Sequence, residues 1–306
     1  MEVLNEHSAA KHPLLQAVIL IMGAIVGMLV FILLGFLLIA ILYGPELILN
    51  TTWIHPGPNA NVGAIKILLT SQQLGLFLMP ALILAWIEKQ SISRYYGVSF
   101  PVRSQVLNTI IFMLVAMPLF SAINGWNQEM TLPNFLKDVE AWMKAKEQEA
   151  LGTTKLILTM KTWGAFISSI IVIGIVPAIC EEFLFRGALQ KVLGRIVANV
   201  HFQIWVAATI FSVIHFQFYG FFPRLFLGVA FGYLYVWSGN IWYAVLAHFV
   251  NNTFAVVISF YYQSQGKSIE NVPEGSISAI GTLLSFALAA WFYYKFYKNR
   301  HADRLN

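Results

Sequence analysis

Two adjacent carboxylates, Glu181 and Glu182, follow a long apolar segment that runs from Trp163 to Cys180, and Arg186 comes shortly after them. Charge at the edge of a membrane segment is costly and is usually kept for function. In a helix, Glu182 and Arg186 stand four residues apart and can form an ion pair. Glu181 is rotated by about 100° from Glu182 and needs another partner. The alternative is that these are ordinary charges where a transmembrane helix meets water.

Three polar side chains interrupt later apolar segments. His215 ends an apolar run that begins at Phe211, and His248 and Asn252 stand four residues apart in a further span, on one face of a helix. Such groups suit activation of a water by Glu181 with His215, and polarisation of a carbonyl by His248 and Asn252. A lone membrane histidine serves as often in an interhelical hydrogen bond. The same donors could instead hold one Zn²⁺ with an open coordination position, and the residues leave this open.

In order, Glu181-Glu182-x-x-x-Arg186, Phe211-x-x-x-His215 and His248-x-x-x-Asn252 resemble the three-motif signature of the CPBP family. This family of CAAX proteases and bacteriocin-processing enzymes, also called the Abi family, includes the type II CAAX prenyl endopeptidases. The resemblance extends to Phe185-Arg186-Gly187 and Trp237-Ser238-Gly239-Asn240. It covers about the segment from Trp163 to Tyr262, and the first three spans add nothing to it.

The resemblance implies an all-α intramembrane endopeptidase. Glu181 would be the catalytic carboxylate that activates water with help from His215. His248 and Asn252 would stabilise the oxyanion, and Glu182 and Arg186 would support the site. The family is commonly labelled as metalloproteases, but a metal-independent glutamate mechanism is also argued for its prenyl-protein members. The motifs lack a His-Glu-x-x-His pair, which favours the second mechanism; we expect no certain cofactor, with Zn²⁺ as the alternative.

Composition requires a polytopic membrane protein. Of the 306 residues, 58% are hydrophobic and 11% are charged, and the mean hydropathy is +0.69. Soluble domains carry about 25% charged residues, so lipid must cover much of this chain. The net charge of +5 comes from basic residues near segment ends, which suits lipid headgroups and gives no indication of nucleic-acid binding.

The hydropathy pattern predicts about eight transmembrane helices, with the catalytic core in the fourth to the seventh. We divide the chain into an N-terminal three-helix region (1–125), an amphipathic interfacial loop (126–162), the catalytic membrane core (163–262) and a C-terminal helix with a basic tail (263–306). The positions of Lys and Arg place both termini in the cytoplasm and indicate a multi-pass protein of the cell membrane. The expected spans are Leu14–Leu42, Ala64–Ile87, Val106–Ile123, Trp163–Cys180, Phe202–His215, Phe222–Trp237, Ile241–Tyr262 and Ile277–Tyr297.

Straight spans conflict with a shared site. At about 1.5 Å per residue, Glu181 would lie near the cytoplasmic end of its span, His248 partway in and His215 near the outer end. Catalysis needs these side chains close together. We therefore expect a kink at Pro177, or a fifth helix that is shorter and offset.

The proposed activity is hydrolysis of a peptide bond in a membrane-associated protein or peptide, of the CAAX type or the bacteriocin-processing type and with or without a prenyl group. Two alternatives belong to other classes. A proton-coupled transporter would relay protons through Glu181 and the histidines, but it is typically built from inverted repeats, and the sequence shows none. A catalytically silent membrane scaffold is disfavoured by the intact motifs.

Overall fold

The computed structural model describes residues 11–267 and 278–299, and these residues form helices and connecting segments with no β-strand. Seven helical segments within them are long and apolar enough to cross a membrane, which confirms an all-α, multi-pass membrane protein. The fifth expected span corresponds to a shorter apolar helix, Val200–Val213, of 14 residues. The start of the last expected span at Ile277 and most of the basic tail lie outside the described residues.

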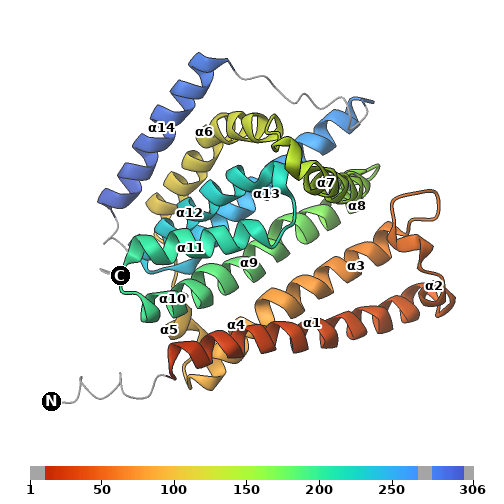
Figure 1. Cartoon of the computed structure of the whole chain (residues 1–306), viewed down its shortest axis with the longest axis horizontal. Coiled ribbons are helices and arrows are strands. Elements are labelled where there is room, and N and C mark those ends of the chain that lie inside the picture. Colours follow the sequence, from red (N-terminus) through yellow and green to blue (C-terminus); the bar gives the residue numbers. More distant parts are fainter. Residues whose placement is uncertain (1–10, 268–277, 300–306) are drawn as a thin grey trace.

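The helices are numbered along the chain as in Figure 1. Segments labelled η are short 3-10 or π-helical stretches, many of them continuous with the neighbouring α-helices. The elements are α1 (Pro13–Tyr43), α2 (Glu46–Leu49), η2 (Thr51–Ile54), α3 (Val62–Gln73), η3 (Leu74–Leu78), α4 (Met79–Ile87), α5 (Ile92–Tyr96), α6 (Arg103–Gln128), η4 (Asn134–Leu136), α7 (Lys137–Leu158), α8 (Trp163–Ser169), η5 (Ile170–Ile175), α9 (Val176–Glu182), η6 (Phe183–Leu189), α10 (Gln190–Ile196), α11 (Val200–Val213), η7 (Phe218–Gly220), α12 (Phe221–Ser238), α13 (Ile241–Ser264) and α14 (Ala279–Lys298).

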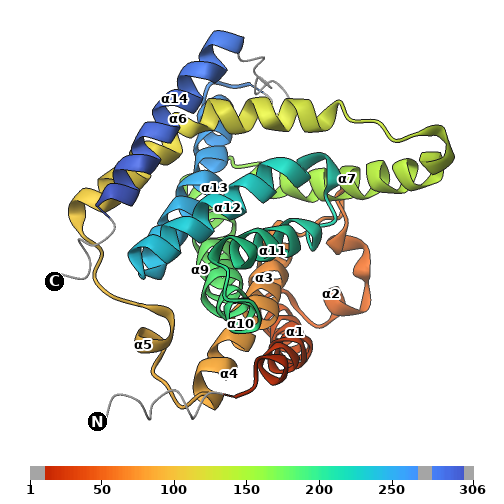
Figure 2. The ribbon, with the colours of Figure 1, turned by 60° about the vertical axis from the view of Figure 1, so that its left-hand side comes forward.

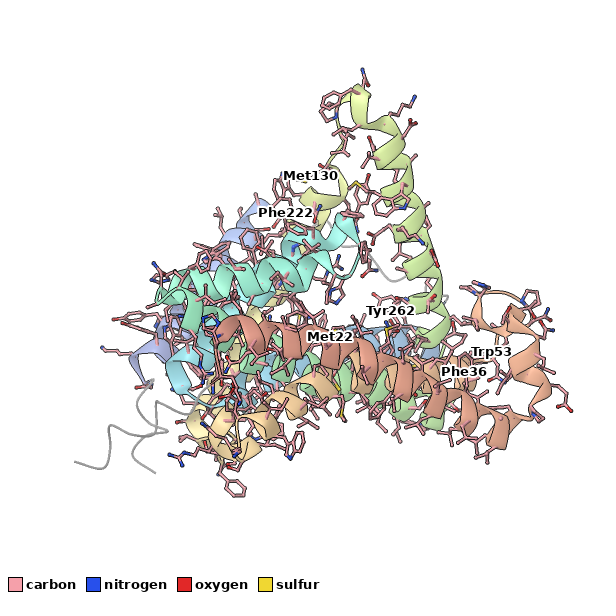
Figure 3. All side chains as sticks on the ribbon, turned by 60° about the horizontal axis from the view of Figure 1, so that its bottom comes forward. Met22, Phe36, Trp53, Met130, Phe222 and Tyr262 are labelled. Carbon is pink, nitrogen blue, oxygen red and sulfur yellow. The ribbon has the colours of Figure 1, made fainter. Side chains whose placement is uncertain are left out.

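The first two spans pack side by side along one edge of the molecule (Figure 1). Small residues allow the close approach, because a Cβ atom on Gly75 would lie 2.4 Å from the carbonyl oxygen of Gly27. Small residues at helix interfaces serve this purpose in membrane proteins. Near the C-terminal end of α1, Trp53 of η2 packs into the same apolar cluster as Phe36 of α1 (Figure 3).

The third and last spans, α6 and α14, form a second pair on the opposite side of the molecule (Figure 2). Pro118 lies inside α6 and interrupts its backbone hydrogen bonds. The hydroxyl of Ser285 in α14 accepts from the N–H of Leu119 (3.0 Å) and donates to the carbonyl of Val115 (2.6 Å). The proline break in α6 is therefore bridged by α14.

The fourth span does not end at Cys180, as the sequence predicts, but continues to Ile196 through α8, η5, α9, η6 and α10. The acidic motif therefore lies inside a continuous 34-residue helical segment. The prediction was wrong because it assumed that a membrane helix ends where charged residues begin. In the structure Glu182, Arg186 and His248 satisfy one another, so the helix can bury them.

The fifth helix, α11, begins and ends two residues earlier than predicted. At about 1.5 Å per residue, the 14 residues of α11 are about 21 Å long, which is less than the ~30 Å hydrocarbon core. The chain then turns at Phe216, whose φ is +52°, and returns through α12. His215 therefore lies at the tip of a short helical hairpin, where it lines one cavity with Glu181 and His248.

Most of the segment 126–162 is formed by the helix α7, which runs from Lys137 to Leu158. This helix stands beside the end of α6 and projects from the bundle (Figure 2). Trp142 contacts Phe218 of η7 with ring centroids 5.4 Å apart, and Met130 and Phe222 line a small pocket beside it (Figure 3). On its exposed side, a hydrogen bond from Lys144 lowers the pKa of Glu140.

Candidate active site

The four side chains predicted to be catalytic, Glu181, His215, His248 and Asn252, line one cavity of about 510 Å³. They come from α9, from the turn after α11 and from α13. The required convergence is thus present, although the elements are far apart in the sequence. The catalytic roles of these residues remain predictions.

Glu182 and Arg186 form the predicted ion pair, with Arg186 Nη1 donating to Glu182 Oε1 at 2.7 Å. Both side chains are almost fully buried. The same carboxylate oxygen lies 2.8 Å from Nδ1 of His248. Because a carboxylate only accepts, we infer that Nδ1 carries a proton and that Glu182 orients the imidazole ring.

Arg186 is fixed on the side away from Glu182 as well. Its Nη2 donates to the carbonyl of Gly228 at 3.2 Å, and its guanidinium carbon lies 4.7 Å from the ring centroid of Phe211 and 5.4 Å from that of Phe231. Phe231 also stacks on His248, with centroids 5.5 Å apart. Cation–π contacts of this kind stabilise a desolvated arginine, so the supporting group is held by α9, α11 and α12.

Glu181 faces a different partner, as its rotation along the helix predicts. Gln73 Nε2, at the end of α3, donates to Glu181 Oε1 at 2.9 Å. Glu181 Oε2 lies 3.9 Å from Nε2 of His248, too far for a hydrogen bond. One oxygen of Glu181 is therefore anchored by Gln73, and the other faces the cavity and His248.

His215 is oriented by its own helix. Its Nδ1 lies 2.7 Å from the carbonyl oxygen of Phe211, four residues earlier. A carbonyl accepts but does not donate, so Nδ1 carries the proton, and Nε2 is the nitrogen that remains for a water or a substrate. The positive φ of Phe216 turns the backbone sharply just after this residue, as often occurs near functional sites.

Asn252 does not contact the other three predicted residues. Its Nδ2 donates to the carbonyl of Ile173 at 3.0 Å, and its Oδ1 accepts from Asn251 Nδ2 at 3.1 Å. Pro177 has no N–H, so the carbonyl of Ile173, four residues earlier, lacks the donor that a regular α-helix supplies. Asn252 replaces that donor and keeps one amide N–H for another acceptor.

The cluster around His248 holds three buried groups that carry formal charges. Arg186 carries one positive charge, and Glu181 and Glu182 carry two negative charges; all three side chains are buried. An uncompensated buried charge is costly. Nε2 of His248 faces Glu181 across 3.9 Å.

The donor set does not fit a zinc site. Within residues 11–267 and 278–299, no group of three or more His, Cys, Asp or Glu side chains is arranged to hold a metal ion. Glu182 is engaged by Arg186 and His248, and the side-chain amide of Asn252 is engaged by Ile173. We therefore derive no chemical step through a metal.

Two residues of the cavity lie outside the three motifs. Gln73 comes from the second span, to which the sequence analysis gave no role, and Arg224 comes from the start of α12. A signal for each was present, because an amide in the apolar run of the second span and an arginine at the start of the sixth are unusual. The motifs do not predict which side chains Gln73 and Arg224 contact.

Comparisons with known proteins agree with this geometry. Residues 163–254 match the family model described as type II CAAX prenyl endopeptidase Rce1-like. Over 139 residues the chain is 29% identical to a protein of Bacillus subtilis (strain 168) described as the uncharacterized protein YpbD, and the match covers 44% of this chain and 67% of that protein. No solved structure matches the chain. Residues 163–254, which carry all three motifs, are thus similar to the CAAX-type intramembrane proteases.

Proposed function

We propose that this protein is an intramembrane endopeptidase that hydrolyses a peptide bond with a water activated by Glu181 and His215. The observation that carries the proposal is the single cavity lined by Glu181, His215, His248 and Asn252. The match of residues 163–254 to a family of prenyl endopeptidases supports the same reaction class.

In this mechanism a water molecule binds between Glu181 and Nε2 of His215. Glu181 removes a proton as the water oxygen attacks the carbonyl carbon of the peptide. The mechanism requires a proton on Nε2 of His248 as well as on Nδ1, and this Nε2–H and the second amide N–H of Asn252 stabilise the oxyanion that forms. Glu181 then returns the proton to the departing amine as the C–N bond breaks, which leaves a carboxylic acid and an amine.

The supporting residues keep this machinery in place. Glu182 orients His248 and is neutralised by Arg186. Gln73 orients Glu181. All of these partners are buried or half-buried, so the groups need little rearrangement when substrate binds, which is the main source of electrostatic catalysis.

The substrate we propose is a membrane-associated protein or peptide with an apolar attachment. An apolar groove of about 660 Å³ shares Gln73, Glu181 and His215 with the catalytic cavity. Its wall is built by apolar side chains of α1, η3, η6 and α11. A prenyl chain, as in CAAX-type substrates, or an apolar segment of a bacteriocin leader or membrane protein has the chemistry to occupy it.

The test is proteolysis by the purified protein in detergent or liposomes. The peptide panel includes a farnesylated CAAX peptide and its unprenylated counterpart, and the Glu181→Ala variant is assayed in parallel. We expect cleavage by the wild-type protein and loss of cleavage in Glu181→Ala. Cleavage that persists in Glu181→Ala would contradict the role of this carboxylate.

Metal dependence is tested in the same assay. We propose a metal-independent reaction, so preincubation with a chelator such as EDTA or 1,10-phenanthroline should leave the rate unchanged. A rate that falls with chelator and recovers with added Zn²⁺ would show instead that the site requires a metal.

A further inference from the structure

Arg224, in the first turn of α12, lines the catalytic cavity but has no part in the mechanism above. Its Nη1 donates to Gln217 Oε1 at 3.1 Å, and its Nη2 donates to the backbone carbonyl of Gln217. Its Nε is buried and has no hydrogen-bond partner. Three of the five N–H groups of the guanidinium therefore remain unused.

Arg224 has no close ion-pair partner within the described residues, although Glu147 and Glu181 lie near enough for their charges to act on it. Among the described residues, no carboxylate forms an ion pair with Arg224, in contrast to the 2.7 Å pair of Arg186 with Glu182. The acidic residue Glu147 on α7 accepts from the N–H of Tyr219 at 3.3 Å and makes no ion pair with Arg224. A half-buried cation with unused donors is costly unless an anion binds to it.

We propose that Arg224 binds a carboxylate of the peptide substrate. This inference rests on the proposed function, because it assigns the group that holds the peptide while Glu181 and His215 act on the scissile bond. The unused Nε–H and Nη–H groups of a guanidinium form a planar fork that matches the two oxygens of a carboxylate. A neutral peptide would leave this fork unsatisfied inside the cavity.

The carboxylate has two sources in a peptide. It is either the free C-terminus, which would place the scissile bond near the end of the substrate, or the side chain of an aspartate or glutamate. Both sources present the same two carboxylate oxygens to Arg224. The proposal therefore names the carboxylate group, and the experiment distinguishes its two sources.

Arg224 also has a positioning role that the experiment has to separate from binding. Its guanidinium lies close to Gly220, where an added Cβ atom would approach Nη1 to 2.7 Å, and it holds Gln217 in the segment that follows His215. Loss of Arg224 could disturb His215 and lower activity on every peptide. Discrimination between matched peptides, rather than activity alone, is therefore the readout.

The experiment measures equilibrium binding, by fluorescence anisotropy in detergent micelles, to the full-length Glu181→Gln variant, so that the result does not depend on turnover. The probes are a farnesylated peptide with a free C-terminal carboxylate, its C-terminal amide, and versions of both in which an internal aspartate replaces asparagine. Arg224→Gln and Arg224→Lys are introduced into the same background. Arg195→Gln serves as the matched control, because Arg195 lies on α10 near Glu88 and does not line the cavity.

We expect the Glu181→Gln protein to bind at least one carboxylate peptide about tenfold or more tightly than its neutral counterpart, as for a charge-assisted hydrogen bond. Arg224→Gln should abolish this difference and leave the affinity for the neutral peptide unchanged. Arg224→Lys should retain part of the difference, because it keeps the charge but not the fork. Arg195→Gln should retain all of it. Preference for the free C-terminus or for aspartate identifies the source of the carboxylate.

Equal affinity for the acid and neutral peptides in the Glu181→Gln protein, or no binding of any probe, would overturn the proposal. So would an Arg224→Gln variant that weakens acid and neutral peptides by the same factor, since this is the result of a positioning role alone. If Arg224→Gln does not fold, Arg224→Lys gives the same test through a reduced discrimination. Carboxylate discrimination in a protein that cleaves no peptide would contradict the proposed function and retain the binding site.

Discussion

At the scale of single residues, the arrangement around Glu181 is the most informative. Two carboxylates adjacent in the sequence have opposite surroundings. Glu182 is fully buried against a cation and an imidazole, whereas Glu181 accepts one hydrogen bond from Gln73 and faces the cavity. Glu182 is therefore engaged in contacts that support the site, whereas Glu181 is available for chemistry.

We predict that Gln73→Ala reduces kcat for peptide cleavage about tenfold and changes KM little. The hydrogen bond from Gln73 goes to an ionised group, and such bonds contribute about 1.5–3 kcal/mol. Here the hydrogen bond orients the carboxylate of Glu181. Steady-state kinetics with the cleaved peptide of the panel measure both constants.

Gln72→Ala is the matched control, because Gln72 is the adjacent glutamine, lines the same cavity and makes no hydrogen bond to Glu181. It should retain kcat close to the wild-type value. Equal losses in the two variants would show that the cavity wall, and not the contact with Glu181, limits the rate.

At the scale of elements, the fourth span is shaped by the position of one proline. A π-helical stretch, Ile170–Ile175, comes directly before Pro177, and a second π-helical stretch follows Glu182. Such widened turns are frequent at functional sites. Here the missing N–H of Pro177 exposes the carbonyl of Ile173 to Asn252 of α13, so the irregular helix and the third motif are coupled.

We predict that Asn252→Ala lowers the free energy of unfolding by about 1 kcal/mol in the wild-type background, because the carbonyl of Ile173 loses a half-buried donor. In a Pro177→Ala background the same substitution should cost less, since residue 177 then supplies an N–H. Thermal unfolding of the four proteins in one detergent measures this coupling.

Additive effects of the two substitutions would contradict the coupling and would mean that Asn252 stabilises the fold by other contacts. The cleavage rate gives an independent readout, because Asn252→Ala should lower it in both backgrounds if the second amide N–H acts on the oxyanion.

At the scale of the whole molecule, the open question is the orientation in the membrane. The basic residues predict that both termini lie in the cytoplasm. The chain offers a convenient probe, because its one cysteine, Cys180, is buried, with 1% of its surface exposed.

We predict that a membrane-impermeant maleimide labels Gly57→Cys in intact cells but labels Gln90→Cys only after permeabilisation. Both positions are exposed, and they lie at opposite ends of the second span. The wild-type protein is the control and should remain unlabelled. Labelling of Gln90→Cys, but not of Gly57→Cys, from outside would reverse the orientation.

The sequence by itself determined the class of protein, the positions of the helices and the pairing of Glu182 with Arg186. These follow from local rules, because hydropathy sets where a membrane helix forms and the helical repeat sets which residues share a face. The three motifs also indicated the side chains that now line one cavity. The same local rules placed the end of the fourth span at Cys180, since they cannot show that a charge is satisfied by a distant partner.

Only the tertiary structure decided which helices meet, and therefore which groups complete the site. Gln73 and Glu181 are 108 positions apart, and His248 and Glu182 are 66 apart. Nearly every face of these helices is apolar, so hydropathy does not specify which faces pack together; small residues, a proline and a few buried hydrogen bonds do. Those contacts brought His215, Gln73 and Arg224 to the cavity that Glu181 lines.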